Sequence, residues 1–179
     1  MRAIKFENND YLDSTGIVNN KEKLSDLLKR KNSFITLIRT TDLEFTTTVN
    51  WERNFVAMQS SINNGNGYLI DDGNGRSISI GKNVKKVKVV GWLALYANDK
   101  NSAVEVMIQK NNLETSAYEL GATNNISTTL YKTTTQILSV NEGDKLDLNI
   151  TLSNIGTYKI YSGNNSLRQS CGFRVEVYE

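Results

Sequence analysis

The stretch VKKVKVVGWLALYA, residues 84–97, decides the fold class of this chain. Side chains of a β-strand point alternately to opposite faces of a sheet, so the stretch presents two rows. One row is apolar throughout: Val87, Val89, Gly91, Leu93 and Leu95. The other row begins with lysines and then becomes apolar: Lys86, Lys88, Val90, Trp92, Ala94 and Tyr96. A solvated sheet keeps one row polar, so we expect a cover over the second row past Val90. In a chain of 179 residues, another copy of itself is the economical candidate.

The residue inventory argues against most enzyme classes. The chain has no histidine and its only cysteine is Cys171, so a zinc site and a histidine-dependent catalytic triad are excluded. None of the common nucleotide-binding, hydrolase or metalloprotease motifs is present. A carboxylate pair for glycoside hydrolysis stays open, because its residues need not be close in sequence. We expect a protein without enzymatic activity, catalytic residues, metal ligands or cofactors.

Length and charge narrow the possible partners. A chain of 179 residues fits one domain with an appendage, and a core of that size needs no disulfide. The formal net charge of +2 does not favour nucleic acid or an anionic membrane as the main partner. Residues 1–16 lack the apolar core of a signal peptide, and no stretch predicts membrane insertion. Synthesis in a cytoplasm is the simplest expectation.

Residues 19–31 predict the one helix of the chain. Asn19 can cap it, Glu22 follows three residues later, and Leu24, Leu27 and Leu28 form a narrow apolar stripe. A helix of this length is marginal alone, so the stripe should dock on the rest of the chain, on a symmetry mate or on a larger assembly. We assign residues 1–33 to an N-terminal arm for attachment or trimer packing, with a simple terminal lid as the alternative.

From Phe34 onward the pattern predicts strands and no further helix. We expect them near 34–40, 43–49, 54–61, 67–71, 76–80, 84–97, 103–110, 115–120, 126–131, 133–140, 144–152 and 171–178. Many short strands separated by turns are typical of a β-sandwich or barrel, so residues 34–179 form an all-β head domain. In residues 144–152 the leucines and Ile150 should face the core, while Lys145, Asp147, Asn149 and Thr151 should face solvent. Cys171 belongs to a core row.

Four segments in this order resemble the family of tumour necrosis factor and complement globular heads. They are VKVVGWLALY (87–96), VEVMIQKNN (104–112), QILSVNEGDKLDL (136–148) and CGFRVEVY (171–178). Within them Lys110-Asn111, Gly143-Asp144 and Gly172-Phe173 match steps of the family pattern. The chain has no proline, so Gly81-Lys82-Asn83 stands where the family often has Pro-Gly before the long strand. The resemblance implies a jelly-roll β-sandwich, here with a short N-terminal helix, and a homotrimer with Val90, Trp92 and Tyr96 at the interface.

A second, shorter resemblance concerns the arm. YLDSTGIVNNKEKLSDLL (11–28) is similar to segments of tail-fibre and baseplate-associated proteins of phages of Gram-positive bacteria. It implies a virion component, made in the host bacterial cytoplasm, whose arm attaches the head to other virion proteins. The alternative is a non-viral trimeric module of the same fold that acts as a ligand for another protein. Neighbouring genes for capsid or tail assembly would favour the phage reading.

Three surface features suggest ligands. The basic cluster Lys82, Lys85, Lys86 and Lys88 is best read as a charged strand start, because it has no interleaved aromatic residues. Asp71 and Asp72 offer oxygens for calcium, but the segment 71–75 reads better as a tight hairpin. Loops 63–75 and 158–168 combine amides and tyrosines, which suits a bacterial surface polysaccharide. The candidate ligand residues are Asn64, Asn66, Asn74, Tyr158, Tyr161, Asn164 and Asn165.

Overall fold

The computed structural model describes residues 4–5, 11–12, 24–97, 103–122, 130–162 and 171–178. Its single described helix is α1 (Leu24–Lys31). The strands are β1 (Ile4–Lys5), β2 (Tyr11–Leu12), β3 (Phe34–Ile38), β4 (Leu43–Thr47), β5 (Glu52–Phe55), β6 (Ser60–Asn64), β7 (Leu69–Asp71), β8 (Ser77–Ile80), β9 (Lys86–Ala97), β10 (Ala103–Lys110), β11 (Leu113–Ala122), β12 (Leu130–Ser139), β13 (Lys145–Leu152), β14 (Gly156–Ile160) and β15 (Gly172–Val177). Among the described residues no helix is long and apolar enough to cross a membrane.

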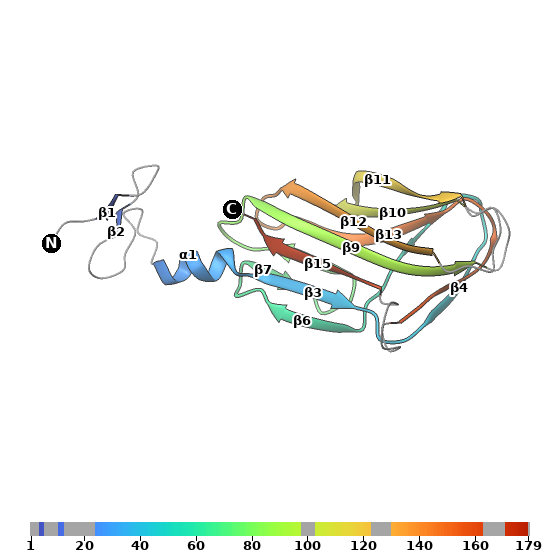
Figure 1. The fold of residues 1–179 in the computed structure, drawn as a ribbon, viewed down its shortest axis with the longest axis horizontal. Coiled ribbons are helices and arrows are strands. Elements are labelled where there is room, and N and C mark those ends of the chain that lie inside the picture. The colour runs from blue at the N-terminus through green and yellow to red at the C-terminus, as the bar shows by residue number, and fades with distance from the viewer. Residues whose placement is uncertain are drawn as a thin grey trace.

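Two antiparallel sheets stack on each other and confirm the predicted jelly-roll β-sandwich (Figure 1). We call them the β9 sheet and the β13 sheet. The β9 sheet runs β6-β3-β15-β9, with β12 on the other edge of β9, and adds β14 and β4 near the end of β9. The β13 sheet runs β7-β8-β13-β10-β11, with β5 also paired to β13. Strands far apart in sequence are neighbours, as in the pair β3 and β15, so most of the pairing is long-range.

Beside β9, each of the next two positions in the sheet is occupied by two short strands placed end to end. β14 and β15 pair with successive parts of the same edge of β9, and β4 and β3 pair with β14 and β15 in turn. Buried Arg39 lies at the break: its backbone N–H donates to the Cys171 carbonyl (2.8 Å) and its guanidinium donates to the Ala57 carbonyl. Asp42 accepts from the Ser162 N–H (2.8 Å) and pairs with Lys159 (3.0 Å), and both contacts lower the pKa of Asp42.

The core lies between the sheets and consists of the rows that the alternation predicted. From β9 it receives Val87, Val89, Leu93 and Leu95, and from β13 Leu146, Leu148, Ile150 and Leu152. Cys171 is fully buried beside them, and burial raises the pKa of its thiol to about 12. A thiol with that pKa stays protonated at neutral pH and is a poor nucleophile.

The structure divides some segments into strands differently from the sequence prediction. The described part of the helix begins at Leu24, and residues 19–23 of the predicted helix lie outside the described residues. The strand expected over 54–61 is two strands, β5 and β6, separated by residues 56–59. Residues 130–139 form one strand, β12, where the prediction ends one strand at 131 and begins another at 133; residues 126–129 lie outside the described residues. Strand β14 was not predicted, because its five residues stand among polar residues and read as loop.

The prediction that Asp147, Asn149 and Thr151 face solvent was wrong. They do point away from the core, because they alternate along β13 with the core leucines and Ile150. Gln109 lies on the same outer face, because it is directly paired with Asp147. However, Asp147 and Thr151 are each 6% exposed, and Asn149 and Gln109 are buried as well. The Asn149 amide donates to Gln109 Oε1 (2.9 Å). Burial, helped by the neighbouring charge of Asp72, raises the pKa of Asp147. Alternation reveals which face a side chain occupies, but not what covers that face.

A tryptophan rests on a glycine on the outer side of the β9 sheet. Trp92 is paired with Gly172 across β9 and β15. A Cβ atom on Gly172 would lie 2.6 Å from Cζ2 of Trp92 and 2.5 Å from the Leu37 carbonyl oxygen. Real Cβ contacts are longer, so the missing side chain makes the space that the indole occupies.

We predict that Asp147→Asn stabilises the protein at neutral pH. A buried acid with a raised pKa favours the folded state only while it is protonated, so its charge opposes folding above that pKa. The free energy of unfolding should rise by on the order of 1 kcal/mol at pH 7. This gain should shrink as the pH falls toward the ordinary value of 3.8. Urea unfolding across pH tests this, with exposed Glu142→Gln as control. A gain that does not depend on pH would contradict the prediction.

We predict that Gly172→Ala destabilises the protein by roughly 1–3 kcal/mol, the usual effect of overpacking. The added methyl group must displace the Trp92 indole or the strand β3 backbone. Denaturant unfolding measures the change, and Ser139→Ala at an exposed site of β12 should leave the midpoint unchanged. An unchanged midpoint for Gly172→Ala would show that the indole does not rest on this glycine.

Candidate functional site

The outer face of the β9 sheet, opposite the core, is the largest candidate surface. The pairing registers place residues of five strands on it, among them Lys86 and Lys88 at the start of β9. The others include Val90, Trp92, Ala94 and Tyr96 of β9; Gly172, Arg174 and Glu176 of β15; Phe34, Thr36 and Ile38 of β3; Ile62 and Asn64 of β6; and Thr135 and Ile137 of β12. Val90, Trp92 and Tyr96, the predicted interface residues, share this face and are half-buried in the single chain.

Two exposed isoleucines lie at opposite edges of this face, one on β6 and one on β12. Ile62 on β6 is 55% exposed and Ile137 on β12 is 54% exposed. Ala94, between Trp92 and Tyr96, is fully buried. The registers keep these isoleucines apart from Trp92: Thr36 and Arg174 lie between Ile62 and Val90, and Ile137 lies opposite Lys88. The apolar centre of the face is therefore the half-buried row Val90, Trp92 and Tyr96 of β9. Aromatic residues are enriched where one protein covers another.

The charges on this face pair with one another. Lys88 lies 3.2 Å from Glu176 Oε1, and the Arg174 Nε lies 3.0 Å from Glu176 Oε2. The Arg174 guanidinium also lies 4.1 Å from the centre of the Phe34 ring. Lys88 and Arg174 thus share the one carboxylate of Glu176, so the three side chains together have a net charge of +1. Pairing lowers the cost of covering these groups but does not remove it.

The predicted ligand residues Asn64 and Asn66 hold the turn between β6 and β7 to the end of α1. The Asn64 amide donates to the Asn32 carbonyl (3.1 Å). The Asn66 amide donates to Ser33 Oγ and to the Asn64 carbonyl, both at 3.1 Å. Asn66 also adopts a positive φ of 53°, which asparagine tolerates better than most residues. Both side chains therefore have a structural role.

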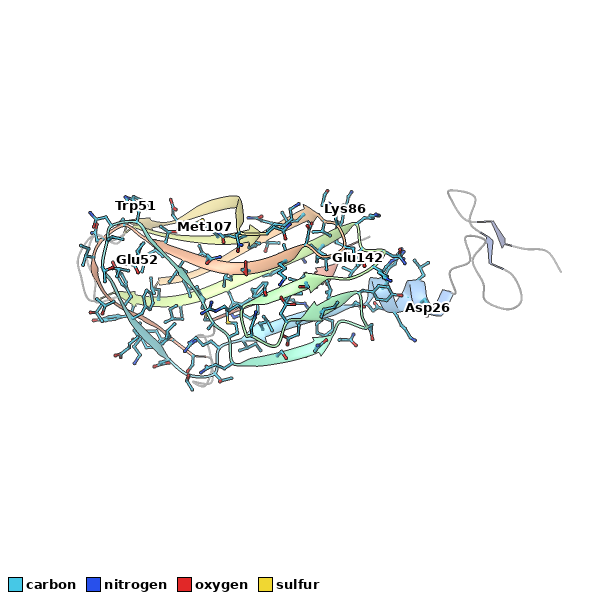
Figure 2. The ribbon with its side chains drawn as sticks, turned by 180° about the vertical axis from the view of Figure 1, so that it is seen from behind. Asp26, Trp51, Glu52, Lys86, Met107 and Glu142 are labelled. Atoms are coloured by element: carbon cyan, nitrogen blue, oxygen red, sulfur yellow. The ribbon has the colours of Figure 1, made fainter. Side chains whose placement is uncertain are left out.

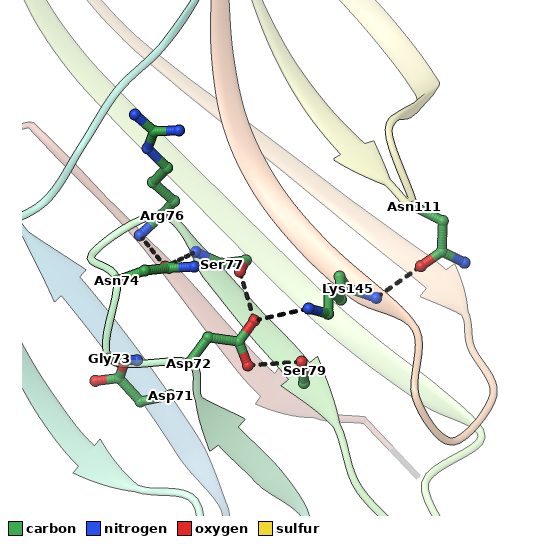
Figure 3. Close-up of polar contacts among 9 residues, drawn as sticks. All are labelled: Asp71, Asp72, Gly73, Asn74, Arg76, Ser77, Ser79, Asn111 and Lys145. Carbon is green, nitrogen blue, oxygen red and sulfur yellow. Dashed lines mark hydrogen bonds and ion pairs between the residues drawn. The ribbon is translucent and has the colours of Figure 1, made fainter.

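The turn between β7 and β8 is held by its own acidic and amide side chains (Figure 3). Asn74 Oδ1 accepts from the N–H of Arg76 (2.8 Å) and of Ser77 (3.2 Å). The Asp72 carboxylate accepts from the hydroxyls of Ser77 and Ser79 and lies 3.7 Å from the Lys145 ammonium. These contacts are those of a tight hairpin.

Asp71 and Asp72 do not share a site. Asp71 Oδ1 accepts from the Gly73 N–H (2.9 Å), and its side chain points away from the Asp72 cluster (Figure 3). Adjacent strand residues face opposite sides, which explains the separation. Within the described parts of the chain, no group of three or more acidic, histidine or cysteine residues is placed to hold a metal ion.

Tyr158 was wrongly predicted as a ligand residue in a loop. It belongs to β14, is 0% exposed, and stacks on Phe45 with ring centres 5.8 Å apart. Its hydroxyl donates to the Asn154 carbonyl (2.8 Å). Tyr161 is half-buried, with the Lys159 ammonium 5.4 Å from its ring centre. Asn164 and Asn165 lie outside the described residues.

The described candidates are thus not brought together in one site. Asn64 and Asn66 lie at the end of the head beside α1, Asn74 lies on the β7–β8 turn, and Tyr158 is in the core. Sequence reasoning missed the residues that complete the outer face of the β9 sheet, namely Gly172, Arg174 and Glu176 of β15. Their signal was available, because they alternate with the predicted core row of residues 171–177.

Comparison with known proteins identifies the fold. No protein-family model and no curated protein matches the sequence. Eiger TNF from S. frugiperda has a TM-score of 0.51 and 7% identity, with 83% of this chain and 94% of that chain covered.

Two further solved structures are similar over comparable lengths. Murine APRIL has a TM-score of 0.49 and 11% identity, with 82% of this chain and 99% of that chain covered. The globular domain of zebrafish complement 1qA protein has a TM-score of 0.45 and 12% identity, with 82% and 98% covered. Identities this low bear on the fold and not on the function. The chain has a TNF-like jelly-roll fold.

Proposed function

We propose that this chain is a trimeric binding module in which copies pack together through the outer face of the β9 sheet. The observation that carries the proposal is the apolar row Val90, Trp92 and Tyr96 at the centre of that face, which the single chain leaves only half-buried. Exposed Ile62 and Ile137 lie at the two flanks of the same face. A stable interface buries about 800 Å² per partner. The face is built from residues of five neighbouring strands, and Glu176 on it pairs with both Lys88 and Arg174.

We further propose that the trimer belongs to a phage particle and binds a polysaccharide on the host cell surface. The similarity of residues 11–28 to tail-fibre and baseplate-associated segments supports the virion assignment. The fold supports the binding role only in general terms, because one fold hosts many functions. Gene neighbourhood separates this proposal from a non-viral protein ligand, since only a virion component should be encoded among capsid or tail genes.

The arm is anchored to the head by polar contacts and keeps apolar surface exposed. The Tyr68 hydroxyl donates to the Asp26 carbonyl (3.2 Å), and the Asn64 amide donates to the Asn32 carbonyl (3.1 Å). Leu28 on α1 is 51% exposed. Figure 1 shows α1 leaving the head at the end where β3 begins. This arrangement supports a role for the arm in attachment to other virion proteins or in trimer packing.

We predict that the full chain has the mass of a trimer by light scattering, and that Trp92→Glu abolishes it. An unpaired carboxylate would enter a contact that excludes water, which costs several kcal/mol. Trp51 is the other tryptophan, exposed in the turn between β4 and β5 at the end of the sandwich away from α1 (Figure 2). Trp51→Glu therefore serves as the matched control and should stay trimeric. Circular dichroism distinguishes a folded Trp92→Glu monomer from an unfolded chain. A wild-type mass of one chain at micromolar concentration would contradict the proposal.

We predict that the wild-type trimer sediments with cell walls of its host, and that Trp92→Glu binds them far more weakly. Three weak sites on one axis act together through effective concentration, and this gain is lost in a monomer. Trp51→Glu should bind like the wild type. If the wild type binds no candidate cell wall, the polysaccharide role is wrong and a structural role on the particle is the better account.

A further inference from the structure

A cleft of about 350 Å³ opens at the edge of the sandwich where β6 of the β9 sheet approaches β7 of the β13 sheet. Its lining combines two apolar side chains with four polar ones: Leu37, Met58, Gln59, Ser61, Asp71 and Asn74. Ser61 is paired with Leu37, and Asp71 is paired with Ile78, so both point inward, toward the space between the sheets. The cleft therefore does not belong to the outer face of the β9 sheet and stays open when that face is covered.

The walls of the cleft are fixed by hydrogen bonds. The Met58 N–H donates to the Gly75 carbonyl (2.6 Å), which ties segment 56–59 to the β7–β8 turn. Gly75 has a positive φ of 68°, and a Cβ on it would lie within 2.1 Å of the Met58 carbonyl oxygen. Gln59 Oε1 accepts from the N–H groups of Thr40 (3.1 Å) and Thr41 (2.8 Å). A ligand would thus meet a preformed site, at little cost in ordering it.

Three polar atoms on the rim of the cleft, one each on Asp71, Asn74 and Ser61, have no hydrogen-bond partner among the described residues. Asp71 uses Oδ1 for the Gly73 N–H and has its second oxygen unused. Asn74 uses Oδ1 for the turn and has its Nδ2 unused. The Ser61 hydroxyl is the third. By contrast, the neighbouring Asp72 carboxylate is fully engaged by two hydroxyls and Lys145.

We propose that this cleft binds one neutral pyranose ring, which deepens the proposed polysaccharide recognition and rests on it. A carboxylate oxygen that accepts and an amide nitrogen that donates suit adjacent sugar hydroxyls, since each hydroxyl can both donate and accept. Leu37 and Met58 form a small apolar floor, since they are only 1% and 5% exposed, and the polar rim supplies most of the contact with the ring. The volume is near the lower end of the range of small-ligand sites, about 300–1,000 Å³, which fits one ring.

The charge of the cleft selects against acidic sugars. Asp71 is the one charged side chain among the residues that line it, and no lysine or arginine is there to bind a carboxylate or phosphate. An anionic ligand would bury a like charge beside Asp71. The expected ligands are therefore neutral hexoses, and D-glucuronate is the matched anionic probe.

The test is an NMR titration of the full chain with D-glucose, D-galactose, N-acetylglucosamine and D-glucuronate. The amides of Gly73, Asn74 and Gly75 should shift with at least one neutral sugar and not with D-glucuronate. Asp71→Asn keeps the oxygen that accepts from Gly73 but removes the charge, and Asn74→Asp keeps the turn oxygen but removes the donor. Each should weaken binding roughly tenfold, the usual effect of losing one hydrogen bond to a charged or buried group.

Glu142→Gln, the same chemical change at an exposed residue that does not line this cleft, should leave the titration unchanged. Absence of shifts with every neutral sugar, or shifts that survive both cleft variants, would overturn the inference. The cell-wall assay separates this result from the broader proposal. If wild type and both cleft variants bind walls equally, polysaccharide recognition stands and the cleft is not its site. If sugars shift the cleft but no wall binds, the cleft stands and host recognition falls.

Discussion

Strand β9 is hydrogen-bonded along both edges and, from Val90 onward, apolar on both faces, and the rest of the structure depends on that constraint. β12 occupies one edge, and β15 followed by β14 occupies the other. Its inner row supplies the core, which satisfies one apolar face. The outer row, Val90 to Tyr96, receives only partial cover within the chain, and the missing side chain of Gly172 leaves room for the Trp92 indole. Burying the remainder requires another molecule, and this physical requirement leads from sequence pattern to assembly.

The breaks between β3 and β4 and between β14 and β15 lie next to segment 56–59, which lines the proposed cleft. Arg39, Asp42 and Lys159 join the strands on either side of these breaks, and Gln59 fixes the segment that crosses the sandwich edge next to the break. The same segment carries Met58, which forms a wall of the cleft proposed as a sugar site. Assembly and ligand recognition therefore use different parts of the head: a broad face of one sheet and a narrow opening between both sheets. A trimer built on the first would present three copies of the second.

The strands and faces of long alternating segments were predictable from sequence. Short strands, and the burial of side chains that face away from the core, were not. β9, β13 and β15 have enough alternation to reveal their faces, and so the sandwich and the outer row of β9 were predicted. β14 was missed because its position is set by pairing with β9, which no local pattern encodes, and Tyr158 was misassigned with it. Asp147 and Asn149 were placed on the correct face but not recognised as buried. The cleft was beyond prediction, because it joins β6, β7 and segment 56–59 through tertiary contacts.

The most direct measurement of the central claim is the rate of thiol labelling on the outer face of the β9 sheet. Ile137→Cys places a thiol on that face, and Ile155→Cys places one in the turn before β14; the parent side chains are 54% and 56% exposed in the single chain. Cys171 should not compete, because it is buried and its thiol pKa is raised to about 12. If copies cover this face, a maleimide should react far more slowly with Ile137→Cys than with Ile155→Cys under native conditions, and equally fast with both in denaturant. Equal native rates would contradict the claim that another copy covers β9.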